Sequence, residues 1–233
     1  MYLRAIPVLS TQHRWKIFIF TLSTDALVPH LKPDEELFLK AIADREEQAV
    51  RRLIDRYQVK VRSIILGLVQ HREEAEELTQ DVFIEVITAA SHFRGESSLG
   101  TWIYRIAVNK SLDHLKKRKR KKRFAFFSSL WSDSATPVVD PPDFLHPGII
   151  LEKQEASVFF FKALDQLPPN QKSAMVLSAM EGLSYEEIGT VMKISVPSVE
   201  SLLFRARQNL RKTLSHFGEE VDRKKKTKRS SNQ

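Results

Sequence analysis

The sequence predicts an all-α protein made of two small helical domains joined by a flexible linker, the second a helix-turn-helix domain. Two observations lead to this prediction. First, residues 34–122 contain no proline, and apolar residues recur at three- and four-residue steps between Leu53 and Leu68. This period places them on one face of a helix. Second, a stretch rich in Pro, Ser and Asp at residues 128–148 carries prolines that prevent a regular helix. No segment shows the alternation typical of a strand.

The boundaries of the predicted domains follow changes of pattern. Residues 1–33 lack a helical period, and residues 218–233 contain the basic run RKKKTKR without an apolar stripe, so we expect both to be poorly ordered. The predicted segments are an N-terminal arm at 1–33, a first helical domain at 34–122, a linker at 123–150, a second helical domain at 151–217 and a disordered basic tail at 218–233. We expect the second domain to be broken at Pro168-Pro169 and near Gly182.

Composition excludes several classes of function. The 233 residues carry a formal net charge of +8, which favours a polyanionic partner, and contain no cysteine. Disulfides, thiolate metal sites and cysteine nucleophiles are therefore excluded. The histidines are scattered, and no paired carboxylates or phosphate-binding glycine loop are found, so we expect neither an enzyme nor a cofactor. The apolar run from Trp15 to Leu22 is too short to span a bilayer, and we expect a cytoplasmic protein.

The second domain begins its helix-turn-helix with a capping signal. Ser184 and Glu187 have the spacing of a capping box, in which the serine hydroxyl caps the amide of Glu187 and the carboxylate reaches back. The first helix is therefore predicted to begin at Tyr185, and it ends near Met192.

The second helix of this pair follows a short turn at residues 193–195. Ser195 can cap it, and Pro197 is tolerated in its first turn. Its predicted core stripe consists of Val199, Leu203, Ala206 and Leu210. A plain helical hairpin would have the same spacing, but the capping box, the short turn and the adjacent basic residues favour DNA binding.

Residues 93–116 combine aromatic, basic and amide side chains in one helical pattern. A polar loop at residues 94–98 runs directly into a helix that carries Trp102, Tyr104, Arg105, Asn109 and Lys110. Rings stack on unpaired bases while Arg and Lys hold phosphates, so this combination is typical of binding to an unstacked polynucleotide. A core position for Trp102 remains an alternative, because apolar residues lie on a nearby face.

An acidic stripe lies on the helix predicted at residues 72–90. Its members, four residues apart, are Glu73, Glu77, Asp81 and Glu85. Stacked like charges destabilise an isolated helix by a few tenths of a kcal/mol per pair, so the stripe favours a basic protein partner. A solvated face and a carboxylate metal site are the alternatives.

Three segments resemble RNA polymerase sigma factors of the sigma-70 family, extracytoplasmic-function (ECF) group. FRG at 93–95 followed by TWIYRIAVN at 101–109 resembles the promoter-melting segment. LTQDVFI at 78–84 is similar to the segment that docks on the clamp helices of the largest polymerase subunit. GLSYEEI at 182–188 with FRAR at 204–207 resembles the domain that binds the minus-35 element.

The resemblance implies a sigma factor that binds core RNA polymerase, through the clamp of the largest subunit and the flap of the second-largest, recognises minus-10 and minus-35 promoter elements, melts the DNA and initiates transcription. It implies region 2 at 34–122, region 4 at 151–217 and an anti-sigma factor as a further partner. The residues implied in core polymerase binding are Glu77, Leu78, Gln80, Asp81, Val82, Phe83 and Glu85. Those implied at the minus-10 element are Phe93, Arg94, Glu96, Ser97, Ser98, Trp102, Arg105, Asn109 and Lys110, with Phe93 and the following loop accepting a flipped base. Those implied at the minus-35 element are Tyr185, Ser195, Pro197, Ser198, Val199, Glu200, Ser201, Arg205 and Arg207.

One departure from the family pattern lies on the predicted recognition helix. Relatives often carry Arg where this chain has Glu200 and Leu202, so we expect an altered upstream promoter preference. The runner-up interpretation is an autonomous helix-turn-helix regulator that does not join polymerase. A third is an RNA-binding helical protein that uses the basic tail.

Overall fold

The computed structural model describes residues 33–130 and 154–230, and every helix or turn of helix in these ranges belongs to one of two groups. The first helical group consists of α2 (Pro33–Ala43), α3 (Glu47–Val69), α4 (Arg72–Ala89), the 3-10 turn η1 (Ala90–His92) and α5 (Leu99–Leu130). The second helical group consists of α6 (Gln154–Asp165), α7 (Pro169–Met175), the π-helical turn η3 (Val176–Met180), α8 (Tyr185–Met192) and α9 (Val196–Ser230). No strand occurs within the described ranges, which confirms the predicted all-α class. In the same ranges no helix is long and apolar enough to cross a membrane.

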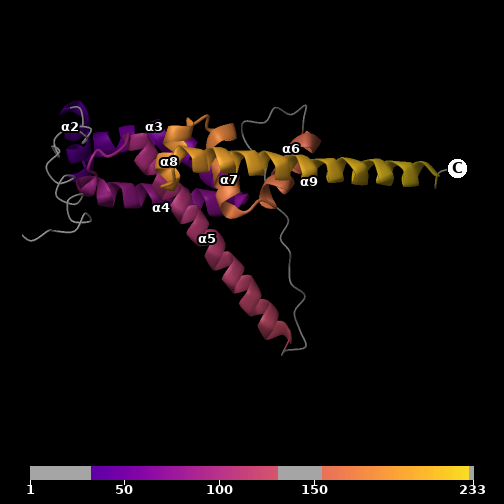
Figure 1. Ribbon diagram of the computed structural model, residues 1–233. Coiled ribbons are helices and arrows are strands. Elements are labelled where there is room, and N and C mark those ends of the chain that lie inside the picture. The colour runs from indigo at the N-terminus through magenta and orange to yellow at the C-terminus, as the bar shows by residue number, and fades with distance from the viewer. Residues whose placement is uncertain (1–32, 131–153, 231–233) are drawn as a thin grey trace, which may run out of the picture.

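The first helical group packs α3, α4 and α5 against one another, with α2 across one end beside η1 (Figure 1). The apolar stripe predicted for the long helix is confirmed in α3. Its buried members are Leu53, Tyr57, Val61, Ile64, Ile65 and Leu68. Burying a side chain of this size stabilises the fold by roughly 1.5–3 kcal/mol, so this stripe is a principal contribution to the core.

The second helical group is built on the N-terminal part of α9, which packs against α6, α7 and α8. The predicted breaks are confirmed: α6 ends at Asp165, α7 begins with Pro169 in its first position, and Gly182 lies between η3 and α8 with φ of 67°. A proline at the first position of a helix has no amide hydrogen bond to lose. Glycine adopts positive φ without the steric cost that a Cβ would add.

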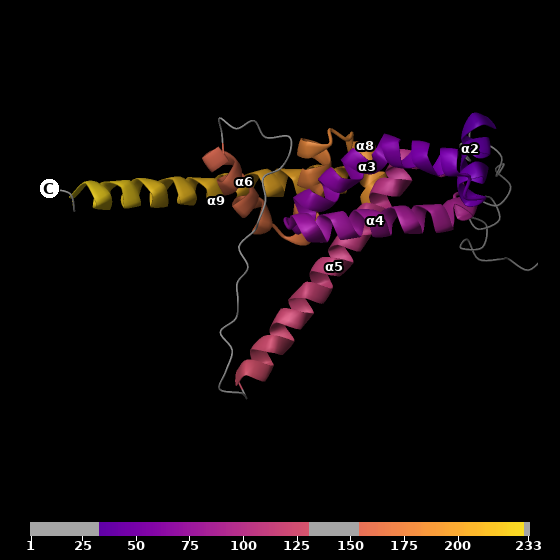
Figure 2. The ribbon, with the colours of Figure 1, turned by 180° about the vertical axis from the view of Figure 1, so that it is seen from behind.

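Two helices extend further than predicted. α5 continues past residue 122 to Leu130, and α9 continues past residue 217 to Ser230, through the segment expected to be disordered. No proline interrupts either extension, and Lys and Arg have good helix propensity. Both extensions project away from the packed helices (Figures 1 and 2). The predicted arm up to residue 32, the part of the predicted linker at 131–150 and the first three residues of the predicted second domain, 151–153, lie outside the described residues.

The two helical groups contact each other. α5 packs against α8, and α3 packs against η3, so the buried residues of both groups form one continuous core. The predicted organisation, two domains joined by a flexible linker, did not include a contact between the domains, and the residue spacing does not predict one.

Candidate functional site

The capping box of the helix-turn-helix is present as predicted. The Glu187 amide donates to Ser184 Oγ at 3.2 Å, and the Ser184 amide donates to Glu187 Oε2 at 2.8 Å. α8 begins at Tyr185 and ends at Met192, as predicted. A Cβ on Gly189 would lie 2.8 Å from the carbonyl oxygen of Ile194, so only glycine allows the turn to approach α8 this closely. The capping box therefore fixes the start of α8, and this glycine allows the close packing of the turn that leads into α9.

The core stripe of α9 is confirmed, since Val199, Leu203 and Ala206 have no exposed surface and Leu210 is almost fully buried. The opposite face is exposed and carries Pro197, Ser198, Glu200, Ser201, Arg205 and Arg207. Val199, one of the predicted minus-35 residues, has its side chain entirely inside the helix-turn-helix core. Leu202 is half-buried and packs against the same core, so it does not face outward with Glu200.

Hydrogen bonds hold the exposed face of α9 in place. Ser195 and Ser198 share a hydrogen bond of 2.9 Å between their hydroxyls, and Arg205 Nε donates to the Ser201 carbonyl at 3.1 Å. Two contacts join α9 to other helices: Arg207 donates to the Tyr185 hydroxyl at 3.4 Å, and Asn209 donates to Gln171 Oε1 at 2.8 Å. Sequence reasoning missed the Asn209–Gln171 pair, because no local motif signals an amide pair between distant segments.

In the first helical group, Phe93 and Trp102 form an aromatic pair. Their ring centroids are 5.0 Å apart with an interplanar angle of 46°, and both side chains are half-buried. Trp102 packs against the core and also against Phe93. The interpretation of Trp102 as a core residue is therefore compatible with its interpretation as a DNA contact. Tilted ring pairs of this kind add about 0.5–1.5 kcal/mol beyond area burial, which fixes the orientation of the Phe93 ring.

The polar loop that follows Phe93 is partly exposed and structured by its own hydrogen bonds. Arg94, Glu96 and Ser98 are exposed, while Gly95 is buried with φ of 72°. Ser98 Oγ accepts from the Thr101 amide at 3.1 Å and contacts the Thr101 hydroxyl at 2.8 Å, so Ser98 caps α5. Ser97 donates to the Ser98 carbonyl at 3.3 Å. The spacing of Ser98 and Thr101 was an available signal for this cap.

The remaining predicted minus-10 residues lie on α5 in three different environments. Asn109 is exposed, and its side chain makes no hydrogen bond to another described residue. Lys110 forms an ion pair of 2.9 Å with Glu85 on α4, which links two predicted contact surfaces. Arg105 donates to the carbonyl oxygen of Thr190 on α8 at 2.9 Å. The structure therefore leaves Asn109 open to a ligand but occupies Arg105 with the second helical group.

The predicted docking helix, α4, separates into a buried and an exposed side. Glu77, Gln80, Asp81 and Glu85 are exposed, and so is Ile84, whose exposed fraction is 63%. Leu78, Val82 and Phe83 are buried in the core at 8%, 0% and 6% exposure. These three predicted polymerase-binding residues therefore hold α4 against its neighbouring helices.

An apolar groove flanks the acidic side of α4 and was not predicted. It has a volume of about 590 Å³ and lies between α3 and α4. Ile54, Ile84 and Ile87 supply apolar lining, and Arg51 and Asp55 supply charged lining. In the sequence, Ile84 and Ile87 on the docking helix were the available signal of this groove. Within the described ranges, no group of three or more His, Asp or Glu side chains is placed to hold a metal ion.

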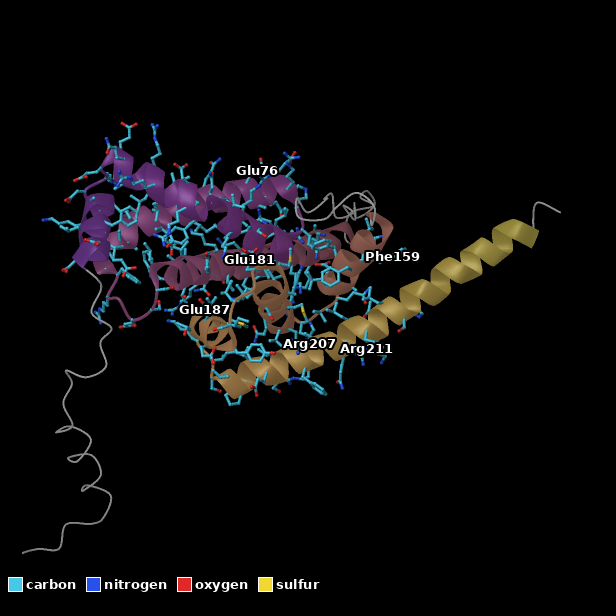
Figure 3. All side chains as sticks on the ribbon, turned by 90° about the horizontal axis from the view of Figure 1, so that it is seen from above. Glu76, Phe159, Glu181, Glu187, Arg207 and Arg211 are labelled. Atoms are coloured by element: carbon cyan, nitrogen blue, oxygen red, sulfur yellow. The ribbon has the colours of Figure 1, made fainter. Side chains whose placement is uncertain are left out.

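Burial shifts the pKa of two side chains, Tyr104 and Glu181. Burial, together with the neighbouring Tyr57 and Glu181, raises the pKa of Tyr104 to about 12. Burial also raises the pKa of Glu181, which Ser63 and Lys60 on α3 partly offset. Both residues lie where the two helical groups meet, and Figure 3 shows Glu181 there, away from Arg207 and Arg211 on α9.

Comparison with known protein families gives two matches. The family described as sigma-70 region 2 matches residues 53–121, which contain the Phe93–Trp102 pair and α4. The family described as sigma-70, region 4, matches residues 160–210, which contain the helix-turn-helix. Both matches fall within the two helical groups.

Curated relatives and solved structures agree with these matches. RNA polymerase sigma-H factor of Pseudomonas aeruginosa is 33% identical over 189 residues, covering 78% of this chain and 93% of the relative. ECF RNA polymerase sigma-E factor of Escherichia coli is 28% identical over 174 residues, covering 75% and 91%. CnrH, solved in complex with the cytosolic domain of CnrY, has a similar fold with a TM-score of 0.55 at 21% identity, covering 78% of this chain and 97% of CnrH. RpoE of Bartonella quintana, solved with the anti-sigma factor NepR, has a TM-score of 0.53 at 22% identity, covering 71% and 96%. The chain therefore belongs to the sigma-70 family of RNA polymerase sigma factors, in its ECF group.

Proposed function

We propose that this sigma factor docks on core RNA polymerase through the exposed side of α4, opens the minus-10 element at Phe93 and Trp102, and reads the minus-35 element with α9. The observation that carries the proposal is the Phe93–Trp102 pair at 5.0 Å, beside a polar loop in the same chain as a helix-turn-helix. A regulator that binds only duplex DNA has no use for a fixed aromatic platform next to such a loop. The chain catalyses no reaction in this account, because binding energy for the melted strand drives opening.

Docking on polymerase uses both charge and apolar contact. Glu77 and Asp81 make no ion pair within the described ranges, so their carboxylates are available to basic groups of a partner. The apolar groove beside them offers Ile84 and Ile87 to apolar side chains. Interfaces commonly combine an apolar centre with a charged rim, and the charged rim accelerates association. We propose the clamp of the largest subunit as the partner of this surface.

Promoter opening needs a site that binds the unpaired strand better than the duplex. Extruding a base costs a few kcal/mol, and stacking on an aromatic ring returns about 1–3 kcal/mol. The half-buried Phe93 ring is held by Trp102, so little side-chain freedom is lost when a base stacks on it. Arg94, which directly follows Phe93, and Asn109 on α5 are both exposed, and we propose that they contact the same strand.

Upstream recognition uses the exposed face of α9. Its N-terminal residues, which include Ser198 and Ser201, are proposed to meet base edges in the major groove. Arg205 and Arg207 are proposed to hold phosphates, which position the helix but carry no sequence information. Region 4 is also proposed to contact the polymerase flap. The solved structure of RpoE contains an anti-sigma factor, and we propose that a protein of that class also binds this chain.

The proposal is tested against the autonomous-regulator interpretation by affinity capture of core polymerase. The purified chain, immobilised through its N-terminus, is incubated with core enzyme that lacks any sigma factor. We expect stoichiometric capture without DNA. A regulator that acts alone would bind promoter duplex and leave core polymerase in the unbound fraction, and that outcome would contradict the proposal.

Replacing Arg205 by Ala should weaken binding to duplex promoter DNA uniformly across sequences. Each phosphate contact releases counterions, so the slope of log K against log salt should fall by about 1 when one contact is lost. Binding measured at several salt concentrations, in the holoenzyme, checks this. The control is Lys212→Ala, another exposed cation further along α9, and an unchanged slope in the Arg205 variant would remove Arg205 from the phosphate contacts.

Replacing Glu200 by Arg should shift the preference of the holoenzyme in the minus-35 element and leave the minus-10 element unaffected. Glu200 is exposed in the first turns of α9, where a carboxylate accepts from cytosine amino groups and repels phosphates. An Arg there favours guanine, by about 1–3 kcal/mol for a bidentate contact. Selection from a library randomised upstream measures the change. Identical enriched sequences for both holoenzymes would show that Glu200 does not face the bases.

A further inference from the structure

A groove lined by basic side chains lies along the C-terminal half of α5, the part of this helix that projects away from the packed helices (Figures 1 and 2). It has a volume of about 700 Å³ and lies between the first turn of α4 and residues 114–125 of α5. The cations that line it are Lys117, Arg118, Arg120 and Lys121. They belong to an unbroken run of Lys and Arg at residues 116–123. We call this feature the basic groove.

Most of the positive charge in the basic groove has no acidic partner among the described residues. Glu74 is the one acidic side chain of the described lining, and its Oε2 accepts from Arg118 Nη1 at 3.0 Å and lies 2.9 Å from His114 Nε2. Lys117, Arg120 and Lys121 are exposed and form no ion pair with another described residue. Lys117 lies three and four residues before the other two, a spacing at which like charges destabilise a helix. The basic groove therefore fits a polyanion that offsets this repulsion.

The basic groove continues the face of α5 that carries the proposed minus-10 contacts. Asn109 follows Trp102 by seven residues, and Arg120 follows Asn109 by eleven. These steps are close to two and three whole helical turns, so the three side chains project in nearly the same direction. From Asn109 to Arg120 the helix rises by about 16 Å, which is the length of about five base pairs. Promoter DNA that contacts Asn109 can therefore extend directly to the groove.

On a promoter, the C-terminal end of α5 must point upstream. The minus-10 and minus-35 elements lie about 25 base pairs apart, roughly 85 Å of duplex. The 23 residues between the end of α5 and the start of α6 span at most about 80 Å. If α5 pointed downstream, its length beyond Asn109, about 32 Å, would add to the distance, and the second helical group could not reach the minus-35 element. The DNA beside the groove is therefore the spacer duplex just upstream of the minus-10 element.

We propose that the basic groove binds backbone phosphates of the spacer duplex, about five base pairs upstream of the base pair that Asn109 contacts. The proposal rests on the proposed function, because it takes the position of the minus-10 element from Trp102 and Asn109. Lys117, Arg120 and Lys121 hold the phosphates, while Arg118, bound to Glu74, positions α5 against α4. Phosphate contacts carry no sequence information, so the groove adds affinity whatever the spacer sequence.

Two triple variants with the same change of charge test the groove. The groove variant combines Lys117→Gln, Arg120→Gln and Lys121→Gln. The control combines Lys119→Gln, Lys122→Gln and Arg123→Gln, which are exposed on the same helix but do not line the groove. Each chain is assembled with core polymerase, and affinity is measured for two promoter fragments without a minus-35 element. One fragment ends at the upstream edge of the minus-10 element, and the other carries about ten further base pairs of spacer duplex.

We expect the added duplex to raise the affinity of the unaltered holoenzyme and of the control by about tenfold, and that of the groove variant by less than about twofold. On the longer fragment, the slope of log K against log salt should fall by about 2–3 in the groove variant, close to 0.9 for each lost phosphate contact. Neutral methylphosphonates in the spacer, about five base pairs upstream of the minus-10 contacts, should weaken the unaltered holoenzyme and leave the groove variant unchanged.

Three results would overturn the proposal. The first is an equal gain from the added duplex in the groove variant and the control. The second is an equal gain from a single-stranded extension of the same length, because the groove would then bind an unpaired strand. The third is weaker binding of the groove variant to core polymerase without DNA, because the partner of the groove would then be a protein. Failure of the unaltered chain to bind core polymerase, or of its holoenzyme to bind the shorter fragment, would instead show that the proposed function itself is wrong.

Discussion

Replacing Glu77 and Asp81 together by Arg is expected to abolish binding to core polymerase while leaving the fold intact. Both carboxylates are exposed on α4, so the free energy of unfolding should change by only about 0.5 kcal/mol or less. Reversing them places like charges against a basic partner, which costs several kcal/mol at an interface. Affinity for core polymerase should therefore fall by about 100-fold or more, measured by fluorescence anisotropy with labelled sigma factor.

The control for this prediction is the double variant Asp44→Arg and Glu46→Arg. These exposed acids lie between α2 and α3, and their reversal changes the net charge by the same amount. The control should bind core polymerase normally. Equal loss in both variants would mean that overall charge, and not the acidic side of α4, governs binding. Wild-type affinity in the α4 variant would remove α4 from the docking surface.

Replacing Phe93 by Ala is expected to spare the closed promoter complex and to impair opening. The ring is a stacking platform for an unpaired base only, so its loss removes about 1–3 kcal/mol from the open complex, or roughly one to two decades in the opening equilibrium. Permanganate reactivity of unpaired thymines measures the opened bubble, and filter binding measures the closed complex.

Two further variants separate stacking from general destabilisation. Phe93→Trp retains a large aromatic face and should restore opening. Phe38→Ala removes another half-buried ring, in α2, and should leave opening unchanged. Equal opening by Phe93→Ala and the unaltered chain would eliminate the flipped-base role of this residue.

Local features of the helix-turn-helix could be predicted from the sequence because they depend on short spacing. Ser184 and Glu187 are three residues apart, and a capping box needs nothing more. The stripe of α3 from Leu53 to Leu68 was predictable in the same way, since helical period alone selects its buried face.

Side-chain direction and long-range packing could not be predicted from the same spacing. Matching a family segment assigned Val82 and Val199 to contacts, although the helical period sends both into the core. The bond from Arg105 to the Thr190 carbonyl joins residues far apart in the sequence, and no local pattern encodes it. Gly67 in α3 lies against η3, where an added Cβ would be 3.0 Å from Met180 Sδ, but a glycine in a helix does not by itself identify its neighbour.

The central claim is that this chain confers promoter-specific initiation on core polymerase, and run-off transcription tests it most directly. Promoter fragments are first selected from genomic DNA by the reconstituted holoenzyme and then transcribed by core enzyme with and without the chain. We predict a transcript of defined 5′ end that appears only when the chain is present and is lost with the Glu77 and Asp81 double variant. A chain that binds these fragments but gives no defined transcript with core polymerase would contradict the account.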